Sequence, residues 1–284
     1  MKRITILINC NDRKGIIGSV TNFIHQQNGN IVYIDQYVAR EENMFFMRLE
    51  CEFSKEVFSL KVFKNIFAEV IGKKFEMNWQ LHDSDLKPKM AIFVSKYEHC
   101  LYDILSRYNS NELDVEIPLI ISNHPDLEYI AKSFDIPFHC IKVTKDTKQE
   151  AEAAQLKLLK ENNINFIVLA RYMQIISANL IAEYPDQIIN IHHSFLPAFP
   201  GAKPYHSAYK RGVKIIGATS HYVTEDLDEG PIIEQDITRV SHSNTINDFI
   251  LKGRDLEKIV LSRALKLHTK RKVMVYNNKT VVFN

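Results

Sequence analysis

The chain has 284 residues, of which 45% are hydrophobic and 25% charged, the composition of a globular protein long enough for two domains. Its 36 basic and 34 acidic side chains leave a net charge of +2, which offers no strong field to a nucleic acid. The four cysteines are far apart and form no Cys-x-x-Cys pair, which argues against a zinc site or disulfide framework and favours the cytoplasm. The apolar run at the N-terminus is too short for a signal peptide or a membrane helix, so we expect no membrane partner.

Residues 1–84 predict a small α+β domain. Alternating and helical apolar spacings place its elements in the order strand, helix, strand, strand, helix, strand, over residues 3–10, 15–28, 31–40, 44–53, 55–72 and 75–82. This βαββαβ order is a ferredoxin-like layout. The segment NCNDRKGIIGSVTNF, with its Asp-Arg-x-Gly turn before the first helix, resembles the opening of an ACT regulatory domain. The alternative is a plain α+β module with glycine at a turn.

The polar segment at residues 85–89 is a predicted linker, and residues 90–284 form the second predicted domain. Short apolar runs at 90–95, 116–123, 137–143, 165–170 and 187–192 alternate with helical stretches at 98–108, 126–133, 149–162 and 176–183. This alternation predicts a Rossmann-like α/β fold with a doubly wound parallel sheet. A long helix at 245–267, with Gly253 inside it, precedes two short C-terminal strands. Ligands bind such sheets at the carboxyl ends of the strands.

Three polar side chains in the stretch NIHHSFLPAFPGAKPYHSAYKRGVKIIGATSHYVTEDLDEGPIIEQD can polarise a carbonyl and move a proton. Asn190 and His192 are two residues apart at a predicted strand end, so both side chains leave the same face. Asp228 lies in a turn before Gly-Pro, and only the fold can bring it to the other two. By the same alternation His193 should point to the opposite face and serve the structure. No cluster has metal-ligand spacing, so we expect no metal.

This stretch resembles the active-site signature of the folate-dependent formyltransferase and formyl-hydrolase superfamily. The resemblance implies that Asn190 and His192 stabilise an oxyanion and that Asp228 acts as the base, with site roles also for His206 and His221. The upstream segment NFIVLARYMQIIS resembles the folate-binding segment of the superfamily, which implies pterin contacts from Met173, Gln174, Ile175 and Ile176. Folate is then the substrate, and no separate cofactor is expected.

The segment after Ser95, KYEHCLYDILSRY, contains no glycine. Glycinamide ribonucleotide formyltransferases have a glycine-rich loop at this place that cradles the phosphate of the acceptor. The segment and the ACT-like N-terminus instead resemble the formyltetrahydrofolate deformylases. The resemblance implies hydrolysis of 10-formyltetrahydrofolate to tetrahydrofolate and formate, with water as acceptor and a role in purine synthesis and one-carbon balance. It also implies a homo-oligomer and leaves an amino-acid effector open.

Two other functions fit the same residues. One is a formyltransferase with a small amine acceptor, and the other is a folate or amino-acid sensor without catalysis. A methionyl-tRNA formyltransferase would need a further nucleic-acid-binding domain and a basic field, so the sequence argues against it.

Overall fold

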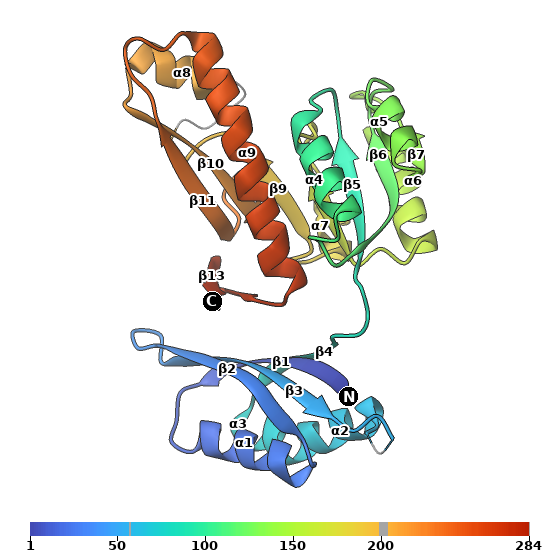
Figure 1. Cartoon of the computed structure of the whole chain (residues 1–284), viewed down its shortest axis with the longest axis vertical. Helices are drawn as coiled ribbons and strands as arrows, with labels where there is room; N and C mark the ends of the chain where they lie inside the picture. The colour runs from blue at the N-terminus through green and yellow to red at the C-terminus, as the bar shows by residue number, and fades with distance from the viewer. Residues whose placement is uncertain (57, 199–203, 284) are drawn as a thin grey trace. The chain divides into compact units, whose positions relative to one another are not determined.

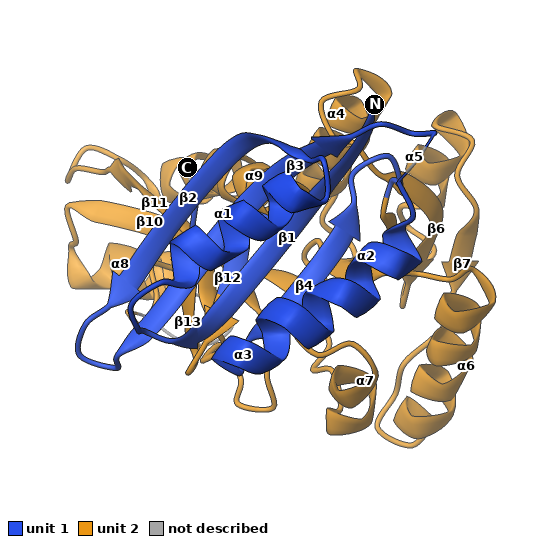
Figure 2. Ribbon diagram, turned by 90° about the horizontal axis from the view of Figure 1, so that it is seen from below, with its two compact units in different colours: residues 1–87, 271–274, 281–284 blue, residues 88–270, 275–280 orange. Residues whose placement is uncertain are grey.

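The computed structural model of the protein describes residues 1–56, 58–198 and 204–283. The chain divides into two compact units, of which unit 1 comprises Met1–Lys87, Arg271–Met274 and Val281–Asn284, and unit 2 comprises Pro88–Lys270 and Val275–Thr280 (Figure 2). The second predicted domain, residues 90–284, therefore contains two short segments that group with unit 1. In the described part of the chain, no helix combines the length and the apolar character needed to cross a bilayer.

Unit 1 is built on a four-stranded sheet in the order β2-β3-β1-β4, with all pairs antiparallel. Its helices cover one face of this sheet, as Figures 1 and 2 show. The strands are β1 (Lys2–Asn11), β2 (Asn30–Ala39), β3 (Met44–Phe53) and β4 (Asn78–Asp83), and the helices are α1 (Ile16–Gln26), α2 (Leu60–Phe67), the π-helical η1 (Ala68–Gly72) and α3 (Lys73–Phe75). The predicted ferredoxin-like layout is confirmed.

Aromatic packing holds the helices of unit 1 to one another. The ring of Phe23 on α1 meets the rings of Phe63 and Phe67 on α2 edge to face, each at a centroid distance of 5.4 Å. This arrangement suits the ring quadrupoles and adds to the free energy gained by burial. On β3, Arg48 is only 1% exposed and donates from Nε to the carbonyl oxygen of Arg271 at 2.9 Å, which helps to explain why residues 271–274 group with this unit.

Unit 2 contains a seven-stranded sheet in the order β11-β10-β9-β8-β5-β6-β7. The strands from β9 to β7 in this order are parallel, whereas β10 pairs antiparallel with both β9 and β11. The strands are β5 (Lys89–Val94), β6 (Glu116–Ser122), β7 (Phe138–Cys140), β8 (Phe166–Leu169), β9 (Ile188–His192), β10 (Ile215–Tyr222) and β11 (Ile232–Arg239). The predicted doubly wound α/β domain is confirmed, with an antiparallel hairpin added beside β9.

Six helices belong to unit 2, counted over the described residues. They are α4 (His99–Asn109), α5 (Glu128–Ser133), α6 (Lys148–Glu161), α7 (Ala178–Glu183), α8 (Pro204–Arg211) and α9 (Ile246–Thr269). The sequence patterns predicted all of them except α8. A final hairpin, β12 (Val273–Tyr276) and β13 (Lys279–Val282), corresponds to the two predicted C-terminal strands.

Helix α9 packs against β9, β10 and β11 and against α4 and α8 (Figure 1). It begins with a capping box, in which Thr245 accepts from the amide of Asp248 and the Asp248 carboxylate accepts from the amide of Thr245. Gly253 lies inside this helix although glycine weakens a helix interior by about 1 kcal/mol relative to alanine. The reason is space, because a Cβ on Gly253 would overlap the ring of Tyr205.

The substitution Gly253→Ala should therefore destabilise the protein, although alanine favours a helix. We expect the overlap with Tyr205 to cost about 1–3 kcal/mol, which outweighs the gain in propensity. The midpoint of urea or thermal unfolding measures the change. The matched control is Gly18→Ala on α1, where a Cβ meets nothing within 4 Å and the midpoint should rise. Equal shifts for both variants would contradict the packing account.

Candidate active site

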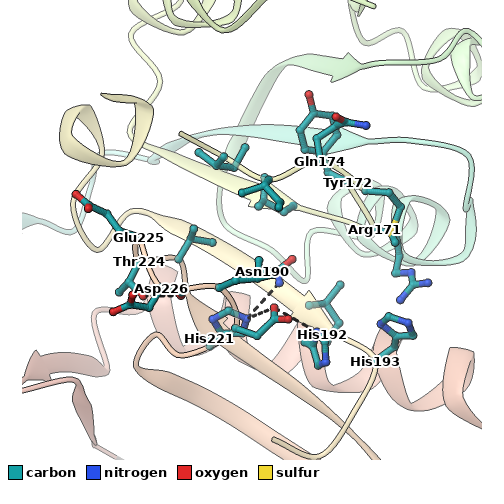
Figure 3. A pocket seen from close by; sticks show the side chains of 18 residues that line it. Arg171, Tyr172, Gln174, Asn190, His192, His193, His221, Thr224, Glu225 and Asp226 are labelled. Atoms are coloured by element: carbon teal, nitrogen blue, oxygen red, sulfur yellow. Dashed lines mark hydrogen bonds and ion pairs between the residues drawn. The ribbon is translucent and has the colours of Figure 1, made fainter. Parts of the chain in front are cut away.

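The carboxyl end of β9 opens into a cavity of about 270 Å³ (Figure 3). Asn190 and His192 reach it from β9, and β10 lies alongside with His221 opposite Asn190 and Thr219 opposite His192. The other walls come from the segment after β8 and from the turn between β10 and β11. The lining residues are Leu169, Arg171, Tyr172, Met173, Gln174, Ile175, Ile176, Asn190, Ile191, His192, His193, His221, Val223, Thr224, Glu225, Asp226, Leu227 and Asp228.

The turn after β10 brings Asp228 back to the end of β9. Asp228 has the left-handed backbone conformation, with φ 59°, which ordinary residues adopt rarely. Gly230 allows the tight return, because a Cβ there would overlap the carbonyl oxygen of Tyr222. As a result Asp228 Oδ1 lies 3.3 Å from His192 Nδ1 and 3.7 Å from His221 Nε2. The structure thus brings together the three residues that were predicted to be catalytic.

The surroundings of Asp228 favour its charged form. Burial alone would raise the pKa of this carboxyl group, but the imidazoles of His192, His221 and His193 outweigh burial and lower the pKa below its ordinary value. Asp228 is therefore a carboxylate near neutral pH, able to orient His192 or to accept a proton.

The hydrogen bonds of His221 fix the amide group of Asn190. His221 Nδ1 lies 2.9 Å from the carbonyl oxygen of Tyr222, which can only accept, so Nδ1 carries a proton. Burial lowers the pKa of His221 and keeps the ring neutral, which leaves a lone pair on Nε2. Nε2 then accepts from Asn190 Nδ2 at 3.1 Å. The second N–H of the Asn190 amide remains for a ligand in the cavity.

His192 also keeps one ring nitrogen for a ligand. Its Nδ1 faces Asp228, so Nδ1 carries the proton that points at the carboxylate. Its Nε2 is buried and has no hydrogen-bond partner among the described residues. A buried nitrogen without a partner costs free energy unless a bound molecule supplies one, which indicates that Nε2 serves a ligand.

The segment expected to contact the pterin lines the cavity with all four of its predicted residues. Met173 and Ile175 expose 45% and 60% of their surface to solvent. Exposed apolar surface is unfavourable in free energy, and a planar ligand that covers these side chains would remove it from water. The backbone amide of Met173 donates to Ser95 Oγ at 3.0 Å, which anchors the segment to the end of β5. Their contact with folate stays a prediction.

The two further histidines with expected site roles are placed differently. His221 lines the cavity, whereas His206 is exposed on α8 and is not among the lining residues. The prolines and glycine of the segment SFLPAFPG, residues 194–201, predict a rigid loop over the site. Pro197 is described, while Pro200 and Gly201 lie outside the described residues.

The prediction that His193 points away from the site was wrong. Strand β9 ends at His192, so the alternation of the strand no longer applies to His193, which bends into the same cavity. No role was predicted for Arg171, although this charged residue comes directly after the predicted strand at 165–170, at the end of the sheet where ligands bind. Arg171 has a left-handed backbone, with φ 62°, and lines the cavity.

Among the described residues, the ligand atoms of His99, Cys100 and Glu257 lie within 4.8 Å of one another and form the one group with the composition of a metal site. Glu257 Oε2, however, already lies 2.9 Å from His99 Nε2 and 3.5 Å from Arg171 Nε. The guanidinium supplies the positive charge that a metal ion would bring, so the residues do not favour a metal here.

The tautomer and charge of His221 are directly testable. Burial lowers the pKa of His221 below the ordinary histidine value of 6.5. The ring should therefore stay neutral and protonated on Nδ1 until the pH falls below 6.5. Protonation would then remove the lone pair that accepts from Asn190. Two-bond ¹H–¹⁵N spectra of histidine-labelled protein over a pH series report both properties, and His221→Gln identifies the signal. A charged ring or an Nε2-protonated tautomer near neutral pH would contradict this account.

Comparison with known proteins agrees with this architecture. Residues 88–265 match the family model of formyl transferases, and residues 4–56 match that of the ACT domain. A formyltetrahydrofolate deformylase from Synechocystis sp. is 50% identical, and the match covers 98% of each chain. One from Bacillus subtilis is 45% identical over 98% of this chain and 93% of its own. The crystal structure of a formyltetrahydrofolate deformylase from Pseudomonas syringae superimposes with a TM-score of 0.97 at 45% identity, over 100% of this chain and 95% of that one. This chain belongs to the formyltetrahydrofolate deformylase family.

Proposed function

We propose that the protein hydrolyses 10-formyltetrahydrofolate to tetrahydrofolate and formate. The observation that carries the proposal is the convergence of Asn190, His192 and Asp228 on one cavity in a chain of this family. The cavity offers apolar surface from the segment after β8 and polar groups from β9, β10 and the turn after β10. This division is typical of sites for a flat heterocycle with one reactive substituent.

The chemistry begins with the formyl carbonyl group. As water attacks the carbon, negative charge develops on the oxygen, and preorganised donors can stabilise it. The free N–H of Asn190, whose amide is held by His221, is one such donor. His192 Nε2 faces the same cavity without a partner among the described residues, and it is a second donor when it carries a proton.

Asp228 completes the reaction as the base. Its lowered pKa keeps it ionised, so it can accept a proton from the attacking water directly while His192 remains the donor. The leaving nitrogen of the folate needs one proton as the C–N bond breaks, and the imidazolium of His192 can donate it. The products are tetrahydrofolate and the formate anion, and the second water proton is released to solvent.

Regulation and assembly extend the proposal beyond the site. The match of residues 4–56 to the ACT domain supports a small-molecule effector, and we propose an amino acid and a homo-oligomeric, cytoplasmic enzyme. Formate released by such an enzyme would feed purine synthesis and balance the one-carbon folate pools.

The first test uses 10-formyltetrahydrofolate without any acceptor and follows tetrahydrofolate and formate together. Asp228→Asn, His192→Ala and Asn190→Ala should each lower kcat by about 100-fold or more, because each removes an acid–base or oxyanion group. The double variant Asp228→Asn/His192→Ala should be little worse than either single one, because the two residues act as a unit.

The control variants carry the same kinds of substitution at positions away from the site. Asp255→Asn alters an exposed carboxylate on α9, and His242→Ala alters an exposed imidazole, and both should keep normal turnover. Formyl loss that requires an added amine would identify a transferase and contradict hydrolysis. Near-normal turnover by Asp228→Asn would contradict its role as the base.

A further inference from the structure

Arg171 is a cation in the wall of the cavity, and the described residues leave its hydrogen-bonding capacity unused. Its side chain is 8% exposed, and it lines the same cavity as the catalytic residues. It donates no hydrogen bond to any of the described residues, and its Nε is buried without a hydrogen-bond partner. A guanidinium group carries five N–H donors. The N–H groups on the two terminal nitrogens of Arg171 are therefore available to a ligand.

Two neighbouring side chains nevertheless restrain the position of Arg171. Its Nε forms an ion pair with Glu257 Oε2 at 3.5 Å, without the geometry of a hydrogen bond. Its guanidinium carbon lies 4.8 Å from the centre of the Tyr97 ring. One edge and one face of the guanidinium are thereby occupied. Figure 3 shows the group pointing toward His193, at the end of the cavity away from Thr224 and Glu225.

Glu257 is held in turn by two further side chains. Glu257 is 1% exposed. Its Oε1 accepts a hydrogen bond from the Tyr205 hydroxyl group at 2.7 Å, and its Oε2 lies 2.9 Å from His99 Nε2. Burial alone would raise the pKa of Glu257, but His99, Arg171 and Tyr205 outweigh burial and lower it. Glu257 is therefore a buried anion that stabilises the charge of Arg171 and restrains its position.

The reaction produces the chemical group that such a guanidinium recognises. A formyl amide is neutral, whereas formate is a planar carboxylate with two equivalent oxygens. Arginine binds carboxylates through two parallel N–H···O bonds, and this pairing is stronger where water is excluded. The neutral formyl group offers no such pair, so a guanidinium at this place can distinguish the formyl group from formate.

We propose that Arg171, positioned by Glu257 and Tyr97, forms a small-carboxylate subsite that takes the formate product as it leaves the catalytic residues. The inference rests on the proposed hydrolysis and adds a place for the anion that hydrolysis creates. Folate also carries carboxylates on its glutamate tail, which is a second source of the same chemistry. The experiment therefore separates formate from folate.

The direct test is a titration of the full-length protein with ¹³C-formate in the absence of folate, followed by the NMR linewidth of formate. The wild-type protein should broaden the signal, and Arg171→Gln should weaken formate affinity by about tenfold or more, because a charged hydrogen-bonding partner is lost. Arg171→Lys keeps the charge without the fork and should fall between the two. The inhibition constant of formate in turnover should shift in the same order.

The matched control is Arg254→Gln. Arg254 also lies over the Tyr97 ring, at 5.9 Å, but it is exposed and is not among the lining residues, so formate affinity should stay at the wild-type value. Arg171→Gln leaves the Glu257 carboxylate buried without its cation and can lower stability. If this variant does not fold, Arg171→Gln/Glu257→Gln removes both charges together, and the same loss of formate affinity is expected from it.

Three results would overturn the subsite. They are an unbroadened formate signal with wild-type protein, equal formate affinity in the wild type and Arg171→Gln, and a loss of tetrahydrofolate affinity alone, which would assign Arg171 to the glutamate tail. Turnover of 10-formyltetrahydrofolate on the same samples separates the two proposals. A protein that hydrolyses the substrate yet binds formate without Arg171 refutes only the subsite, whereas formate binding without hydrolysis refutes the proposed function.

Discussion

The return of a carboxylate to the end of β9 is the constraint on which the rest of the site depends. Asp228 meets His192 at 3.3 Å only because the turn between β10 and β11 folds back tightly. The left-handed backbone of Asp228 and the missing side chain of Gly230 make this fold possible. The paired strands β9 and β10 supply the fixed frame, so the geometry belongs to the hairpin as a whole.

Electrostatics then assigns a different state to each group around that carboxylate. Burial lowers the pKa of His221 and leaves it neutral, while nearby imidazoles lower the pKa of Asp228 and leave it charged. A neutral His221 can accept from Asn190, and a charged Asp228 can hold the proton of His192. The same cavity therefore contains an oriented amide, a carboxylate, and an imidazole whose Nε2 has no hydrogen-bond partner among the described residues.

The sequence predicted best what depends on neighbours in the chain. The spacing of Asn190 and His192 placed both on one face, and apolar periodicity predicted every helix of unit 2 except α8. Asp228 could be linked to them only through a resemblance, because no local pattern predicts contact across a turn. The same local rule failed at His193, since β9 ends one residue earlier. The link from Arg171 to Glu257 joins residues far apart in the sequence, and only packing reveals it.

Hydrolysis and formyl transfer differ in the molecule that attacks the formyl carbon. The segment after Ser95 lies beside this place and helps to position a charged side chain there. This segment contains no glycine, and the structure shows what two of its bulky side chains do. Tyr97 lies against the guanidinium of Arg171, and His99 binds the Glu257 carboxylate that holds it. A fixed cation in the wall attracts a carboxylate, while uncharged water is unaffected. The residues that stand in place of a glycine-rich loop therefore hold the cation to which we assign the formate product.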